Sequence, residues 1–177
     1  NSTDGKLRGL GVVSAWSSAS SLITARYGNA GSGTQTAGLS TGGNIGPSDT
    51  RTTATEEYNG SGFSTGGALP TATRSGGAAG TQTATIFAGG YDTANTAEAY
   101  TYDGSSWTVI PALNQARRSL DQNMAGTTTA AIIAGGYVEP SRTANSEEYN
   151  GSSWSEGNNL NTARSDAAAG GIQTASF

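Results

Sequence analysis

The sequence contains no cysteine and no histidine. Without cysteine the chain can form no disulfide, thiolate metal site or cysteine nucleophile. Without histidine it lacks the commonest general base and metal ligand, and we expect no catalytic residue, metal or cofactor. Nine basic residues stand against thirteen acidic ones, for a net charge of −4, which argues against a nucleic-acid partner. No apolar run approaches the roughly 18 residues of a membrane span, so we expect no membrane insertion.

Large aliphatic residues are also scarce, since the 177 residues include only 8 Leu, 7 Ile, 4 Val and 3 Phe. So low a share is typical of a disordered chain only when the net charge is high, which it is not here. Glycine is abundant, with 27 residues, and alanine and threonine are frequent as well. A core of small residues and a few aromatics can be stable when one contact is repeated many times, so the composition directs attention to internal repeats.

One stretch is written three times in the chain. The copies are Thr53–Phe63 (TATEEYNGSGF), Thr93–Trp107 (TANTAEAYTYDGSSW) and Thr143–Trp154 (TANSEEYNGSSW). In each copy an alternating polar and aromatic run leads into Asn-Gly or Asp-Gly and then to a large aromatic residue. These dipeptides predict a type I′ turn with two residues at positive φ, and therefore a β-hairpin in which Gly104 and Gly151 take positive φ.

Other landmarks recur with the same phase. Gly-Gly pairs end at positions 43, 90 and 136, and the aromatic residues Trp16, Phe63, Trp107 and Trp154 follow one another at spacings of 47, 44 and 47. Each aromatic is followed by a leucine and then by an arginine, in the series Arg26, Arg74, Arg117 and Arg164. A repeat of about 46 residues therefore organises the chain.

Each repeat is predicted to contain four short antiparallel strands. In the best-defined copy they cover residues 74–80, 83–90, 96–102 and 106–111. A repeat of this length with four strands is typical of a β-propeller blade. The first strand is almost entirely Gly, Ala and Ser, as expected of an innermost strand that is crowded against a central axis.

This pattern of a Gly-Gly pair, a tyrosine before a turn, a tryptophan and an arginine resembles the kelch motif. It covers nearly the whole chain, from about Gly11 to Phe177, although Gly11 stands where a tyrosine is expected. The sequence pattern TEEYNGSSW…LNTAR…GTQTA is similar to the Ala/Gly/Thr-rich kelch-like repeats found in structural proteins of marine bacteriophages. The resemblance implies an all-β fold of kelch-type β-propeller blades.

We expect residues 1–177 to form a single kelch-like propeller domain or part of one. The complete units are predicted at about 27–66, 74–111 and 120–157. A split fourth blade would combine residues 7–18 with 165–177. A closed four-bladed ring, a fragment of a larger propeller and a ring assembled from several chains all remain open, with some preference for the last two.

The repeated charged residues are interpreted as structural. Adjacent residues of a strand point to opposite faces, so Glu56–Glu57 and Glu147–Glu148 are each expected to be split by the sheet and to face a repeated arginine rather than to act as paired acids. The arginines themselves are expected to orient the connection between successive units, although a basic ring for anionic ligands is the alternative.

The least regular segments are the loops between the second and third strands of each unit, residues 44–51, 91–95 and 137–142. They are expected to share one rim with the arginine-bearing connections, and binding residues concentrate on such loops. The candidate binding residues are Asn44, Asp49, Arg51, Tyr91, Asp92, Tyr137, Glu139 and Arg142.

The sequence-based hypothesis is a non-catalytic surface protein of a phage virion, such as a tail fibre or tail tip. Its partners would be host surface glycan or other virion proteins, with a homo-oligomer as the expected assembly. A secreted or cell-surface bacterial adhesion module is the alternative, and a glycan-degrading enzyme that relies on carboxylates alone is a further one.

Overall fold

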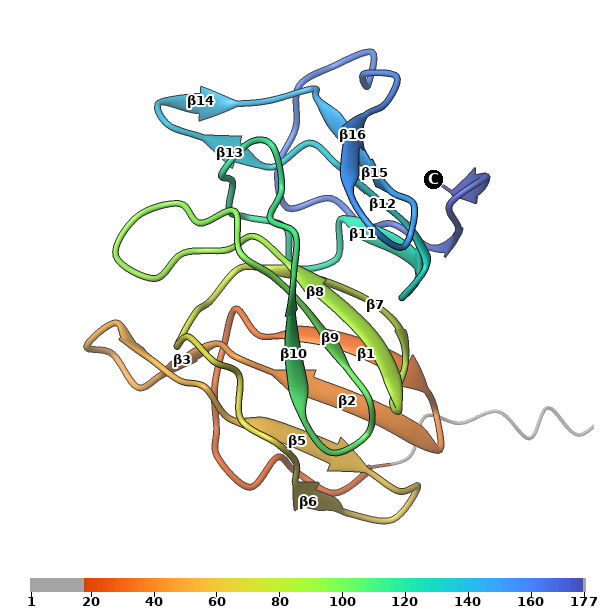
Figure 1. Ribbon diagram of the computed structural model, residues 1–177. Coiled ribbons are helices and arrows are strands. Elements are labelled where there is room, and N and C mark those ends of the chain that lie inside the picture. The colour runs from red at the N-terminus through yellow and green to blue at the C-terminus, as the bar shows by residue number, and fades with distance from the viewer. Residues whose placement is uncertain (1–17, 177) are drawn as a thin grey trace, which may run out of the picture.

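The computed structural model describes residues 18–176, and within them every regular element is a strand. There is consequently no helix in this part of the chain that could span a membrane. Figure 1 shows the strands gathered into sheets that follow one another along the chain, from the red end to the blue end. The expectation of an all-β fold is confirmed.

Three four-stranded antiparallel sheets make up most of the structure. Sheet 1 consists of β1 (Ala30–Thr34), β2 (Ala37–Thr41), β5 (Thr55–Tyr58) and β6 (Phe63–Thr65). Sheet 2 consists of β7 (Gly77–Thr81), β8 (Ala84–Ala88), β9 (Ala99–Tyr102) and β10 (Trp107–Ile110). Sheet 3 consists of β11 (Met124–Thr127), β12 (Ala130–Ala134), β15 (Ser146–Tyr149) and β16 (Trp154–Glu156). Strands are hydrogen-bonded in chain order within each sheet, as four consecutive antiparallel strands predict.

Three short hairpins lie outside these sheets. They are β3 (Asn44–Ile45) with β4 (Thr50–Arg51), β13 (Tyr137–Val138) with β14 (Ser141–Arg142), and β17 (Gly171–Ile172) with β18 (Ala175–Ser176). The first two hairpins are the variable loops of the first and third units. The third lies where the first two strands of a split fourth blade were expected, while residues 7–17 of that blade lie outside the described residues.

The first strands of the three sheets pack side by side, with β7 between β1 and β11. Their residues are small because the backbones approach closely. A Cβ added to Gly77 would lie 3.1 Å from Cβ of Met124, and one added to Gly76 would overlap the ring of Phe87. Several of the most buried apolar side chains, such as Ile86 and Ile133, come from the second strands. Small first strands and larger second strands together make up the core.

The tyrosine before each turn packs against the aromatic residue after the turn, across the third and fourth strands. Tyr102 pairs with Trp107 and Tyr149 with Trp154, with ring centroids 4.9 and 5.1 Å apart. The indole N–H of Trp107 donates to the carbonyl oxygen of Gly67, at the end of the preceding unit. The tryptophans thus join neighbouring units as well as neighbouring strands.

The hairpin turns between these strands differ from the predicted type I′ turn. Gly104 and Gly151 do have positive φ, at 94° and 93°. However, Asp103 and Asn150 do not, and the loops contain four residues rather than two. The Oδ1 atom of Asn150 instead accepts the N–H groups of the two serines that follow Gly151. This side-chain capping, typical of an Asx-turn, takes the place of a second positive-φ residue.

The Gly-Gly pairs connect each unit to the next. The N–H of Gly90 donates to the carbonyl of Arg117 at 2.8 Å, and the N–H groups of Gly43 and Gly136 make the same bond to Thr73 and Arg164. Gly89 and Gly90 both have positive φ, and a Cβ on Gly89 would lie 2.8 Å from the carbonyl oxygen of Arg117. Both the backbone conformation and the close approach require glycine at this junction.

Candidate functional site

The variable loops lie together at one edge of the structure. In Figure 1 the β3–β4 hairpin, the loop between β8 and β9, and the β13–β14 hairpin all project toward the left of the view. Two arginines from the connections between units, Arg74 and Arg118, reach this edge. We call the loops 44–51, 91–95 and 137–142, together with Arg74 and Arg118, the loop rim.

The repeated arginines fall into two groups, and the series defined from the sequence contained members of both. Arg26 and Arg117 are buried beneath the connections and pair with Glu56 and Glu147. Arg117 donates through Nη1 to the carbonyls of Gly135 and Asn145, and its Nη2 lies 2.7 Å from Oε1 of Glu147. The structural interpretation of these two arginines and their glutamates is therefore confirmed.

Arg74 does not belong to that series, because the junction hydrogen bonds align Thr73 with Arg117. Unit 2 has no buried ion pair. In unit 3, Glu147 pairs with Ile133 of the neighbouring strand. At the equivalent place in unit 2, Tyr100 pairs with Phe87. Phe87, Tyr100 and Trp107 form an aromatic cluster there instead. Arg74 is equivalent to Arg118, the residue after the buried arginine, and both side chains turn to the loop rim.

Tyr91 is the centre of the loop rim. The guanidinium carbons of Arg51, Arg74 and Arg118 lie 5.8, 4.8 and 5.1 Å from the centroid of its ring. Such distances allow cation–π attraction, which here brings together three side chains of like charge, one from the β3–β4 hairpin and two from successive junctions. We call Tyr91 and these three arginines the arginine node.

Arg118 is held on several sides while leaving its guanidinium partly exposed. It lies over the ring of Tyr137 at 4.5 Å, and its Nη1 donates to Oδ1 of Asn95 at 2.8 Å. Asn95 in turn donates to the carbonyl of Tyr137, which fixes the amide. The carboxylate partner, Glu139, is 3.4 Å away with a side chain that is 67% exposed. An exposed ion pair of this kind is weak, so the guanidinium is positioned but incompletely neutralised.

Asp49 supplies a carboxylate that pairs with two arginines of the node. Its carboxylate lies 2.9 Å from both Arg51 and Arg74, and it accepts a hydrogen bond from Nδ2 of Asn44. That hydrogen bond, followed by the two arginines, lowers the pKa of Asp49 below its usual value. Since Arg74 belongs to the junction that follows unit 1, Asp49 links two successive units across the rim.

The other candidate residues have more local roles. Asn44 is buried and orients Asp49 and Tyr27. The carboxylate of Asp92 accepts the backbone N–H groups of Thr93 and Ala94, which lower its pKa. The hydroxyl of Tyr137 donates to the carbonyl of Pro140, and Arg142 is exposed and donates to Ser165.

Two hollows flank the loop 91–95. Hollow A, of about 430 Å³, is lined in part by Asp49, Arg51, Thr71, Ala72, Asp92 and Thr93. Hollow B, of about 540 Å³, is lined in part by Tyr91, Asn95, Ala116, Arg118, Val138 and Glu139. Both volumes fall in the range of small-ligand sites. The loop rim therefore offers concave surface with polar, aromatic and small apolar walls.

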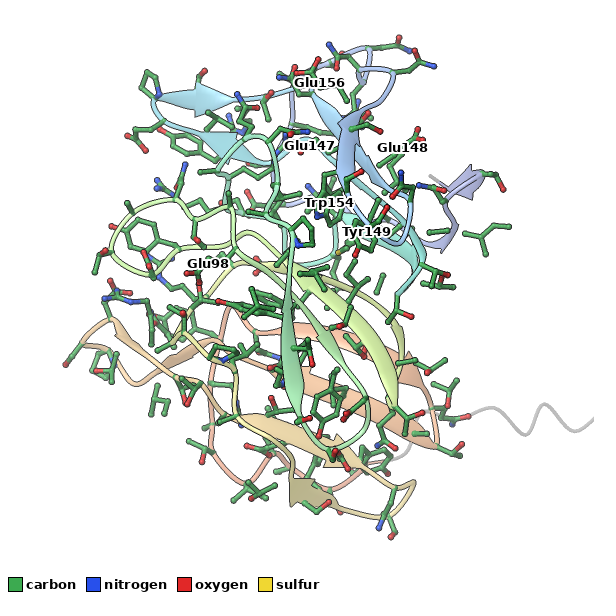
Figure 2. The ribbon with its side chains drawn as sticks, viewed as in Figure 1. Glu98, Glu147, Glu148, Tyr149, Trp154 and Glu156 are labelled. Carbon is green, nitrogen blue, oxygen red and sulfur yellow. The ribbon has the colours of Figure 1, made fainter. Side chains whose placement is uncertain are left out.

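The carboxylates of the sheets do not assemble into a second site. Figure 2 shows Glu147 and Glu148 on opposite sides of β15, as predicted, with Glu98 well apart from both. Glu57 accepts a hydrogen bond from Tyr102, and burial, together with this bond, raises the pKa of that tyrosine to about 12. Among the described residues no group of three or more acidic side chains could hold a metal ion.

The sequence located the loop rim but missed part of it. Tyr91, Asp49, Arg51, Tyr137 and Glu139 do converge there, whereas Arg118 and Asn95 were not among the candidates. The Arg117–Arg118 doublet was the available signal, because successive residues of an extended segment face opposite sides. No protein-family model matches this chain, and no curated protein sequence matches it significantly.

Proposed function

We propose that the three sheets are blades of a kelch-like β-propeller. Three features support this architecture: four strands hydrogen-bonded in chain order in each sheet, small first strands packed side by side, and the same Gly-Gly junction from unit to unit. An array of blades places the connections between second and third strands on the same rim as those between units. The loop rim is then the functional face of the propeller.

On this fold, the chain acts as a non-catalytic binding module of a phage surface appendage, and the loop rim binds a host-surface glycan. The observation that carries this proposal is the arginine node with a hollow on each side of its loop. Sugars present apolar C–H faces that pack on aromatic rings, and hydroxyl groups that bond to amides, carboxylates and guanidinium groups. Tyr91, Tyr137, Asn95, Arg118 and Glu139 provide those groups on a small area.

The state of the carboxylates supports a binding role over hydrolysis. Glycoside hydrolysis needs two carboxyl groups placed about 5–9.5 Å apart on either side of a sugar, one of them able to give up a proton. Two of the three rim acids are already engaged: Asp49 pairs with two arginines, and Asp92 caps its own turn. Glu139 is exposed and loosely paired, and one carboxylate alone does not meet this requirement. The buried Glu56 and Glu147 are bonded to Arg26 and Arg117.

A glycan array that includes surface polysaccharides of marine bacteria tests this function. The wild-type chain is expected to bind a restricted set of glycans, Tyr91→Phe to retain that binding and Tyr91→Ala to lose most of it. Replacement of residues 137–142 by a short Gly-Ser turn is expected to leave the thermal unfolding midpoint nearly unchanged while altering the set. Binding that survives both changes would overturn the assignment to this rim. Hydrolysis of a bound glycan that is lost on replacing one Asp or Glu would instead make the protein an enzyme.

A further inference from the structure

Hollows A and B occupy equivalent places at successive junctions. Hollow A lies between the loop of unit 1 and that of unit 2, over Thr71 and Ala72 of the first connection. Hollow B lies between the loops of units 2 and 3, over Ala116 of the second connection. Ala72 and Ala116 each precede the aligned junction residues Thr73 and Arg117. Equivalent hollows therefore occur at two successive junctions of the repeat.

The two hollows are neighbours on one continuous surface. The loop 91–95 separates them, with Asp92 and Thr93 lining hollow A and Tyr91 and Asn95 lining hollow B. The arginine node also crosses this boundary, because Arg51 lines one hollow and Arg118 the other while both lie over Tyr91. A ligand that extends from one hollow to the other must pass the node.

Charge is distributed unevenly between this surface and the rest of the chain. The loop rim carries four arginines (Arg51, Arg74, Arg118 and Arg142) and three acids (Asp49, Asp92 and Glu139). The remaining described residues carry three arginines, two of them buried, and nine acidic side chains. An anion approaching an acidic protein is therefore directed toward the rim.

The node can accept an anion without losing its own structure. The contacts of Arg118 with Tyr91, Tyr137 and Asn95 do not involve Glu139. Glu139 lies on the exposed β13–β14 hairpin and is only loosely paired. A ligand carboxylate can thus replace it, and the planar guanidinium favours a two-point contact with such a group.

We infer that the ligand is a linear acidic oligosaccharide that occupies hollows A and B together and places a carboxylate at the arginine node. This inference rests on the proposed glycan-binding function and specifies its chemistry. It assigns Tyr91 and Arg118 to recognition of the central sugar. Arg51 and Thr93 on one side, and Asn95 and Val138 on the other, contact the flanking sugars.

Isothermal titration of the full chain with galacturonate and mannuronate oligomers, from disaccharide to hexasaccharide, tests the inference. At least one series is expected to bind at least tenfold more tightly as a tetrasaccharide than as a disaccharide. The same oligomers with their carboxylates reduced to alcohols are expected to bind at least tenfold more weakly, and raising the salt concentration is expected to weaken only the acidic series. Thr93→Ala and Val138→Ala, which alter one hollow each and leave the residues of the arginine node in place, are both expected to weaken binding of the long oligomer. Arg164→Gln, at an exposed arginine that is not among the lining residues of either hollow, is the matched control and is expected to change nothing.

Each contrary outcome has a distinct meaning. Equal affinity for short and long oligomers, or an effect of only one of the two hollow variants, would overturn the two-hollow ligand and leave the proposed function intact. Equal binding of the reduced oligomers would overturn the acidic requirement. Binding of neutral glycans alone on the array would also overturn the acidic requirement. Displacement of the oligosaccharide by an oligoglutamate peptide at equal concentration would overturn the carbohydrate class. An absence of binding to every glycan, neutral or acidic, would reject the proposed function together with the inference.

Discussion

Arg117 and Arg118 are neighbours in sequence with opposite surroundings. The side chain of Arg117 is completely buried and bonded to two carbonyls and Glu147, whereas that of Arg118 lies on the rim between two tyrosine rings. Burial lowers the pKa of Arg117, although its usual value is so high that the charge is retained at neutral pH. The same residue type thus stabilises a junction at one position and presents a binding group at the next.

The buried pair gives a prediction at the scale of single residues. Arg117→Met and Glu147→Gln are each expected to lower the free energy of unfolding by about 3–5 kcal/mol, because each leaves a buried charge without its partner. The double variant is expected to lose clearly less than the sum of the two. Chemical denaturation of all four proteins in a double-mutant cycle measures this coupling.

Arg164→Met serves as the control, since Arg164 is exposed and, among the described residues, its side chain hydrogen-bonds only to the carbonyl of Thr162. It is expected to change the unfolding free energy by no more than about 0.5 kcal/mol. Losses that add without coupling would show that Arg117 and Glu147 stabilise the fold independently of each other.

The hairpin between third and fourth strands is the best-conserved element from unit to unit within this chain. Trp154 is buried against Tyr149, and its indole N–H donates to the carbonyl of Pro111 in the preceding connection. Trp154→Ala is expected to cost about 3–5 kcal/mol, the usual range for a large buried aromatic. Trp154→Phe is expected to cost less, since unit 1 has Phe63 at the equivalent place. Thermal unfolding midpoints compare the two, and an unchanged midpoint for the alanine variant would contradict this packing.

The turn of the same hairpin gives a pH dependence. The N–H of Ser106 and the hydroxyl and N–H of Ser105 lower the pKa of Asp103 from 3.8 to about 2. A carboxyl group with a lowered folded-state pKa adds stability above its unfolded pKa and loses it as the pH falls through the folded value. The contribution of Asp103 is therefore expected to disappear between about pH 4 and pH 2.

Exchanging Asn and Asp between units isolates this effect. Asp103→Asn is expected to flatten the stability profile in that pH window, because Asn150 supports the same turn without a titrating group. Asn150→Asp is expected to steepen it. Urea denaturation at several acidic pH values reports both slopes, and unchanged slopes in the two variants would contradict the role assigned to this side chain.

Sequence reasoning succeeded where one physical rule determined the outcome. Small residues and polar–aromatic alternation predicted strands at 74–80 and 96–102, which begin three residues before β7 and β9 and end within one residue of them. The turn type was wrong because Asn-Gly fits both a two-residue I′ turn and an Asx-capped loop of four residues. Arg74 was placed in one series with Arg26, Arg117 and Arg164, although it lies 11 residues after Phe63 and each of the others lies 10 residues after its tryptophan. The junction hydrogen bonds show that Thr73, at the 10-residue spacing, is the aligned residue.

At the scale of the whole molecule, unit 2 differs from its neighbours in having a described sheet on each side. Strand β7 packs against both β1 and β11, and Ile86 and Phe87 of β8 are at most 1% exposed. This unit also lacks the buried Arg–Glu pair and contains the cluster of Phe87, Tyr100 and Trp107 in its place. Apolar burial and two neighbours should make it the most stable part of the chain.

Native-state hydrogen exchange with detection by mass spectrometry can test this order of stability. Amides of β8 and β9 are expected to exchange most slowly, because opening them requires the loss of both junctions as well as the aromatic cluster. Amides of β12 and β15 should exchange faster, and those of β17, which is exposed and among the described strands pairs only with β18, faster still. Phe87→Leu is expected to bring the β8 and β9 rates toward those of β12 and β15, whereas Val109→Ala, at an exposed position of β10, should leave them unchanged. Slower exchange in sheet 3 than in sheet 2 would mean that the buried ion pair, rather than enclosure between two neighbours, sets the stability of a unit.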